Sequence, residues 1–168
     1  MPTIVVMGVS GSGKSHVGAA LARACGVGFV EGDELHPAAN IAKMRAGIPL
    51  DDADRQPWLA AIAAAIAAHR GQGVVVACSA LRRAYRDVLR QADPSLRLLY
   101  LRVARDELAR RMRGRQHFMP LALLDSQLAT LEEPAVDERA LVLEGAGDAA
   151  SMVALARRGL RSATETGG

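Results

Sequence analysis

Short apolar runs alternate with longer segments of helical periodicity along this sequence. Runs rich in Val, Ile and Leu predict buried strands at residues 3–7, 29–30, 74–78, 96–103 and 141–143. Between them, apolar side chains recur at helical spacing, which predicts helices near residues 16–23, 59–66, 81–89, 106–113, 121–131 and 151–160. The acidic segment 48–58 predicts a connector, with a helix that begins near Pro57.

This alternation predicts an α/β fold, with a parallel five-stranded sheet covered by helices on both faces. The length of 168 residues suits one domain, 1–168. Ligands of such sheets bind beyond the carboxyl ends of the strands. The first three strands bring Gly8, Asp33 and Ser79 to that edge.

The first strand leads directly into a glycine-rich segment that fits the pattern G-x-x-x-x-G-K-[ST] at every fixed position. Its glycines allow backbone N–H groups to approach a polyphosphate, and the helix that follows adds partial positive charge. We therefore expect the nucleotide to be bound by Gly8, Val9, Ser10, Gly11, Ser12, Gly13, Lys14 and Ser15. Lys14 is expected to reach the β- and γ-phosphates, and the Ser15 hydroxyl to bind Mg²⁺. The alternative is a glycine-rich turn without a ligand.

Asp33 follows the second strand and is the first candidate for catalysis. Phosphoryl transfer needs a carboxylate near Mg²⁺ and the attacking oxygen. Asp33 could take the proton of the acceptor hydroxyl, or orient that hydroxyl and help Ser15 to hold the hydrated metal. The competing interpretation is a solvated turn aspartate.

The formal net charge is only +3, but arginines concentrate between Arg82 and Arg115. Such a concentration can serve a nucleic-acid surface or the handling of phosphate by a small kinase. We favour the kinase, without a nucleic-acid partner, because the glycine-rich segment already requires anion binding.

Neither a signal peptide nor a membrane-spanning run is expected, because the chain enters its first strand at once and its longest apolar run is short. Cys25 and Cys78 follow no metal or redox spacing, and a buried, inert thiol is expected at Cys78. These features predict a cytoplasmic protein.

Several blocks further along are more specific than the phosphate loop. They are Glu31-Gly32-Asp33, Leu35-His36-Pro37, Asn40-Ile41, Lys43-Met44, Asp54-Arg55, Pro57-Trp58-Leu59, Cys78-Ser79-Ala80-Leu81, Tyr85-Arg86-Asp87, His117-Phe118-Met119 and Ser126-Gln127. With these blocks, the sequence resembles the gluconate kinases from the first strand to Pro134.

The resemblance implies ATP- and Mg²⁺-dependent phosphorylation of D-gluconate at its terminal hydroxyl, which gives 6-phosphogluconate and ADP. It also implies the fold of the small P-loop kinases, similar to adenylate and shikimate kinases, and a homodimer. A small polyhydroxylated anion needs a cation for its carboxylate and several polar groups for its hydroxyls. Suitable side chains in the matching blocks are those of Asp33, His36, Lys43, Arg55, Ser79, Arg86, His117 and Gln127. Three of them have simpler interpretations: Arg55 as a surface ion pair, His36 as loop packing and Arg86 on a solvated helix face.

The arginine-rich stretch after the fourth strand resembles the mobile lid of small kinases, at about residues 110–120. One or two guanidiniums there would neutralise the charge that develops on the transferring phosphoryl group. Arg111 and Arg115 are the chosen catalytic candidates because they fall toward the loop. The spacing of residues 113–117 departs from the family pattern, so the division of work among these arginines stays open.

Two alternatives remain. Shikimate kinase, or another kinase of a small acceptor, is the near alternative, and identifying the acceptor would distinguish it. A nucleotide switch or nucleic-acid-associated P-loop protein would belong to a different class. Against that class stands the third strand, which ends in Cys78-Ser79 and not in the aspartate with which such proteins hold Mg²⁺.

Overall fold

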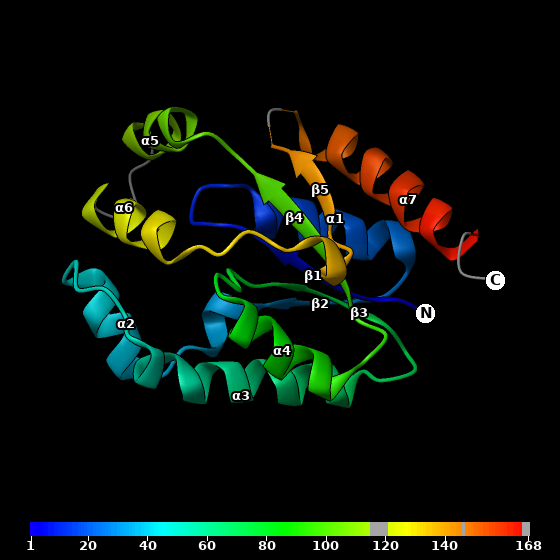
Figure 1. The fold of residues 1–168 in the computed structure, drawn as a ribbon, viewed down its shortest axis with the longest axis horizontal. Coiled ribbons are helices and arrows are strands. Elements are labelled where there is room, and N and C mark those ends of the chain that lie inside the picture. Colours follow the sequence, from blue (N-terminus) through cyan, green and yellow to red (C-terminus); the bar gives the residue numbers. More distant parts are fainter. Residues whose placement is uncertain (115–120, 146, 166–168) are drawn as a thin grey trace.

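The computed structural model describes residues 1–114, 121–145 and 147–165. At its centre is a five-stranded sheet of order β2-β3-β1-β4-β5, and all its pairings are parallel (Figure 1). The strands are β1 (Thr3–Met7), β2 (Gly28–Glu31), β3 (Val74–Ala77), β4 (Arg97–Arg102) and β5 (Leu141–Glu144). The predicted fold class is confirmed, and β1 in the middle of the sheet places the glycine-rich segment at its centre.

Helices cover both faces of the sheet and so form a three-layer structure (Figure 1). On one face lie α1 (Lys14–Cys25) and α7 (Ala149–Glu165), and on the other lie α3 (Asp52–Ala68) and α4 (Arg83–Ala92). Three further helices lie toward the carboxyl ends of the strands: α2 (Ala38–Arg45), α5 (Arg105–Arg113) and α6 (Leu121–Thr130). Two 3₁₀ turns, η1 (Gly32–Leu35) and η2 (Val136–Glu138), complete the described elements.

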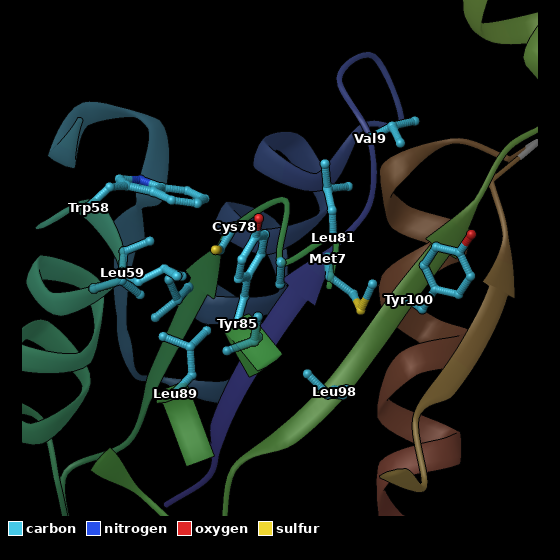
Figure 2. Packing of buried hydrophobic residues seen from close by; sticks show 14 of the residues in the cluster. Met7, Val9, Trp58, Leu59, Cys78, Leu81, Tyr85, Leu89, Leu98 and Tyr100 are labelled. Atoms are coloured by element: carbon cyan, nitrogen blue, oxygen red, sulfur yellow. The ribbon is translucent and has the colours of Figure 1, made fainter. Parts of the chain in front are cut away.

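Alternate residues of β1 serve the two faces. Ile4 and Val6 pack toward α1 and α7, whereas Val5 and Met7 belong to the larger core under α3 and α4. Figure 2 shows this larger core, in which Trp58 and Leu59 of α3 lie beside β3. All of these β1 side chains are fully buried, which is why the strand reads as one continuous apolar run.

Helix α3 begins at Asp52, so the predicted start near Pro57 is wrong. The Asp51 carboxylate accepts from the Asp54 N–H at 2.7 Å, and the Asp54 carboxylate accepts from the Asp51 N–H at 3.0 Å. This capping box starts the helix earlier and leaves Pro57 inside it, without the N–H that a helix interior normally uses. Arg55 and Trp58 therefore stand on a rigid helix and not on a connector.

Cys78 is fully buried beyond the end of β3, and burial raises the pKa of its thiol to about 12. The predicted inert thiol is consistent with this environment. None of the helices in the described ranges is both long enough and apolar enough to cross a lipid bilayer.

Candidate active site

The glycine-rich segment connects β1 to α1 and presents unsatisfied polar groups. Gly13 caps α1 in the left-handed region, at φ 91°, a conformation that favours glycine. Lys14 is only 6% exposed, yet within the described residues its ammonium group has neither a carboxylate partner nor a hydrogen-bond acceptor. The buried Ser12 hydroxyl also has no hydrogen-bond partner there. A buried cation and an orphaned hydroxyl at a helix N-terminus suit a bound polyphosphate.

Helix α6 braces this segment through Gln127. The Gln127 amide oxygen accepts from the Ser10 N–H at 2.8 Å, and its amide nitrogen lies 3.3 Å from the Ser10 hydroxyl. Gln127, predicted to bind the acceptor, therefore also ties α6 to the glycine-rich segment.

A cavity of about 140 Å³ opens between this segment, η1, α3 and α6. Its apolar wall includes Met44, Leu50 and Leu123. The structure brings seven of the predicted site residues together around it, namely Ser10, Lys14, Asp33, His36, Arg55, Ser79 and Gln127.

Gly32 explains how Asp33 reaches this cavity. A Cβ atom at position 32 would lie 2.3 Å from the Ala77 carbonyl oxygen, so only glycine lets the chain cross β3 this closely. The Gly32 carbonyl oxygen accepts from the Trp58 indole N–H at 2.8 Å. The Asp33 side chain is exposed at the cavity, directly after this anchor.

His36 lies flat against Trp58. The two ring centroids are 4.3 Å apart and the ring planes differ by 10°. Burial lowers the pKa of His36 below its ordinary value; the charge of Asp33 opposes this effect, and that of Arg55 adds to it. A neutral imidazole at the cavity is the result. Trp58 is buried in the core and also supports this ring.

Arg55 is a buried cation whose charge stays uncompensated at contact distance. It is 9% exposed, and one of its amino groups donates to the Tyr85 hydroxyl at 3.2 Å. Its guanidinium carbon lies 5.6 Å from the Tyr85 ring centroid. No carboxylate of the described residues lies within ion-pair distance of it. The simpler interpretation of Arg55, a surface ion pair, does not fit this environment.

Lys43 and Arg86 are not brought into the cavity. The Lys43 ammonium group pairs with the Asp54 carboxylate at 2.8 Å and so links α2 to α3. Arg86 is fully buried, and its guanidinium donates to the Glu138 carboxylate at 2.7 and 3.0 Å. It also donates at 2.8 Å to the carbonyl oxygen of Ala80, a non-glycine residue with φ 46°. Both cations are already paired within the protein.

Arg111 does not line this cavity but lies beside a second hollow, which also borders the glycine-rich segment. Its guanidinium donates to the Gly11 carbonyl oxygen at 2.9 Å, to the Gly145 carbonyl oxygen and to Glu107. These contacts border this second hollow, of about 450 Å³, lined by Ser12, Gly13, His16, Gly147 and Met152 among others. The other predicted lid residues, Arg115 and His117, lie outside the described residues.

Sequence reasoning missed two residues of this site. Tyr85 supports Arg55, and Asn40 contacts His36 through its amide nitrogen at 3.2 Å. Both stand in the blocks that carry the family resemblance, which was the available signal, but residue type alone assigned them no role.

Comparison with known proteins agrees with this geometry. The family model described as an AAA domain matches residues 4–134. A gluconokinase of Gluconobacter oxydans (strain 621H) is 48% identical over 145 residues, which cover 84% of this chain and 82% of that protein. The crystal structure of a gluconokinase from Sinorhizobium meliloti 1021 superimposes with a TM-score of 0.91 at 51% identity, covering 98% of this chain and 94% of that one.

A shikimate kinase from Bacteroides thetaiotaomicron shares the fold, with a TM-score of 0.68 at 18% identity over 95% of this chain and 98% of that one. The glycine-rich segment, the acceptor-side cavity and the close relatives lead to the same assignment: this chain belongs to the gluconokinase family of P-loop kinases.

Proposed function

We propose that this protein transfers the γ-phosphoryl group of ATP to the terminal hydroxyl of D-gluconate, giving 6-phospho-D-gluconate and ADP for sugar-acid catabolism. The observation that carries the proposal is one cavity lined by Lys14, Asp33 and Arg55, a cation without a carboxylate partner in the described part of the chain. A phosphate-binding cation, a carboxylate and a second cation are what a kinase of an anionic, polyhydroxylated acceptor requires.

Arg55 is the proposed partner of the gluconate carboxylate. A guanidinium that is buried without a carboxylate retains unused donors for a planar anion. Of the other candidates, His36, Ser79 and Gln127 line the same cavity, and we propose that they bind hydroxyl groups. Lys43 and Arg86, predicted as substrate ligands, instead support the site from behind, because their charges are paired with Asp54 and Glu138.

Asp33 is the proposed catalytic carboxylate. It either accepts the proton of the attacking hydroxyl or orients that hydroxyl. Lys14, with Arg111 and Arg115 from the predicted lid at about 110–120, neutralises the charge that develops on the phosphoryl oxygens.

Ser15 and Asp33 are the proposed protein contacts of Mg²⁺. The described residues contain no group of three or more His, Cys, Asp or Glu side chains that could enclose a metal. A sparse donor set fits Mg²⁺, which keeps several waters and takes other ligands from substrate phosphates. When bound, the ion supplies charge neutralisation at the phosphate oxygens.

We also propose that the protein acts as a cytoplasmic homodimer, with residues 1–168 as one kinase domain. The family resemblance and the absence of metal or redox spacing at Cys25 and Cys78 support this proposal. Sedimentation equilibrium at micromolar concentration would test the dimer, and a single monomeric mass would contradict it.

An acceptor screen tests the activity. With ATP and Mg²⁺, turnover is expected with D-gluconate, and NADP⁺ reduction in a coupled assay with 6-phosphogluconate dehydrogenase would identify the product. Shikimate, nucleoside monophosphates and the uncharged polyol D-glucitol serve as alternative acceptors. Turnover with shikimate but not gluconate would overturn the proposal, and salt-dependent RNA binding without any phosphorylation would favour the non-transferase class.

A further inference from the structure

Asn40 is a buried amide with no role in the phosphoryl-transfer scheme above. It stands on α2, is 3% exposed and lies behind His36. Its amide nitrogen contacts two atoms: the Asp54 backbone oxygen at 2.8 Å and the His36 Nδ1 atom at 3.2 Å.

The chemistry of these two contacts fixes which atom donates. A backbone carbonyl oxygen can only accept a hydrogen bond, so the amide group must turn its NH₂ toward Asp54. The opposite orientation would place two acceptor oxygens at 2.8 Å. The same NH₂ group then directs its second proton at His36 Nδ1, which must accept it. A neutral imidazole that accepts at Nδ1 carries its own proton on Nε2.

The Nε2 atom is the ring nitrogen that remains for a ligand. The imidazole lies against Trp58 and borders the cavity beside Arg55 and Asp33. Stacking at 10° between the ring planes fixes the plane of the imidazole, and the contact of its Nδ1 atom with Asn40 selects one of the two ring orientations within that plane. The imidazole thus offers a donor to the cavity and no acceptor.

We propose that Asn40 is a positioning residue that holds His36 in its Nε2–H tautomer, so that the imidazole donates a hydrogen bond to an oxygen of the acceptor substrate. The part of this inference that concerns gluconate rests on the proposed function; the part that concerns the tautomer does not. An oxygen atom at this point of the substrate is required, and a deoxy analogue would leave the donor unsatisfied.

His69 provides an internal reference with the opposite arrangement. Its Nδ1 atom lies 2.8 Å from the Ala65 backbone oxygen, which can only accept. His69 must therefore carry a proton on Nδ1. One protein thus holds two histidines whose hydrogen-bond partners demand different proton positions.

Long-range ¹H–¹⁵N NMR of the ligand-free protein, with ¹⁵N-labelled histidine, tests the tautomer of His36 directly. At neutral pH, His36 is expected to show an unprotonated Nδ1 and a protonated Nε2, with His69 protonated on Nδ1. The spectra of His36→Gln and His69→Gln assign the signals. A His36 ring protonated on Nδ1 in the wild-type protein would overturn the inference, whatever the substrate proves to be.

Kinetics of Asn40 variants test the positioning role. Asn40→Asp replaces the donor with an acceptor and should reverse the tautomer, whereas Asn40→Ala removes the contact. Both should raise KM for gluconate about tenfold, the usual value of one hydrogen bond to an anionic or hydroxylated ligand, and leave KM for ATP and kcat within about twofold. His69→Gln, the matched control, should leave all three constants unchanged.

A double-mutant cycle separates positioning from simple structural support. In a His36→Gln background, Asn40→Ala should raise KM for gluconate no further, because the ring that Asn40 orients is gone. Fully additive effects, or an unchanged KM in both single Asn40 variants, would contradict the proposal. Should Asn40→Asp fail to fold, the wild-type spectrum and the Asn40→Ala cycle still decide it. If His36 carries its proton on Nε2 but the protein does not phosphorylate gluconate, the proposed function is refuted and the tautomer assigned to His36 is retained.

Discussion

Tyr85 and Arg86 are neighbours on α4, yet their side chains belong to two different regions. In one region a buried arginine has no carboxylate partner among the described residues, and in the other a buried arginine is paired with a carboxylate. The Tyr85 hydroxyl accepts a hydrogen bond from the guanidinium of Arg55, which lines the cavity proposed for the acceptor. Arg86 belongs to what we call the Glu138 cluster, formed by Glu138, Arg86 and Arg90. There the Glu138 carboxylate accepts from both arginines and from the Ala135 N–H.

The two regions show how a buried cation can be used. In the Glu138 cluster, charge and hydrogen-bond capacity are largely satisfied inside the protein, so Arg86 stabilises the turn at Ala80 beside Ser79. Arg55 donates instead to the phenol hydroxyl of Tyr85 and keeps further donors for a ligand. A buried charge without an opposite charge costs folding free energy, and a binding site is where such a cost is retained.

Removing Arg86 should produce the largest change. Arg86→Ala leaves the Glu138 carboxylate buried with Arg90 as its remaining cation, and breaking a buried pair in this way typically costs about 3–5 kcal/mol of unfolding free energy. Urea unfolding would measure this loss of unfolding free energy, provided that the m-value of the variant equals that of the wild-type protein. A stable Arg86→Ala protein that has lost its affinity for gluconate would place Arg86 in the binding site after all.

Lys14 is the opposite case, a buried cation that we propose serves the transferred phosphoryl group. Lys14→Ala should lower kcat by roughly two to three orders of magnitude, as the loss of one charge-stabilising donor typically does. Because Lys14 has no ion-pair partner among the described residues, the melting temperature of the Lys14→Ala variant should not fall below that of the wild-type protein. Near-normal turnover would refute its role.

Arg55 should affect binding more than folding. Arg55→Met is expected to raise KM for gluconate by roughly 10- to 100-fold, since hydrogen bonds to charged groups contribute about 1.5–3 kcal/mol. The preference for gluconate over D-glucitol should shrink by the same factor, while thermal stability is kept. Lys43→Met is the matched control, because the Lys43 charge is already paired with Asp54, and its KM should stay within about twofold. An equal rise in KM for gluconate in Arg55→Met and Lys43→Met would mean that a paired and an unpaired cation contribute alike to binding.

The smallest expected change is confined to acid. Burial alone would raise the pKa of Glu138, but hydrogen bonds from Arg86, the Ala135 N–H and Arg90 outweigh it and lower the pKa to about 2. A carboxylate with a depressed pKa stabilises the fold above its unfolded pKa, near 4.5, and loses that contribution as pH falls toward 2. Glu138→Gln should flatten this part of the stability curve between pH 4.5 and 2, measured by urea unfolding at each pH. An unchanged acid slope would mean that Glu138 contributes nothing to it.

The order of the strands and of the described helices other than α2, the glycine-rich segment and the position of Asp33 after β2 could be predicted from local pattern. The different uses of Arg55 and Arg86 could not, because the partner of Arg86 lies 52 residues away in η2. Pro57 misled the prediction of α3 because the Asp51–Asp54 capping box outweighs the preference of proline for a first turn. Asn40 stands in a block that carries the family resemblance, but the role we propose for it depends on a contact with Asp54 that only the folded chain creates.

Gly32 has a consequence for attempts to alter the acceptor. Since any side chain there would collide with the Ala77 carbonyl, this position tolerates no mutation that keeps β2 against β3. A mutagenesis library aimed at other sugar acids should leave it constant. Diversity belongs instead at Met44, Leu50 and Leu123, whose side chains line the cavity proposed for the acceptor.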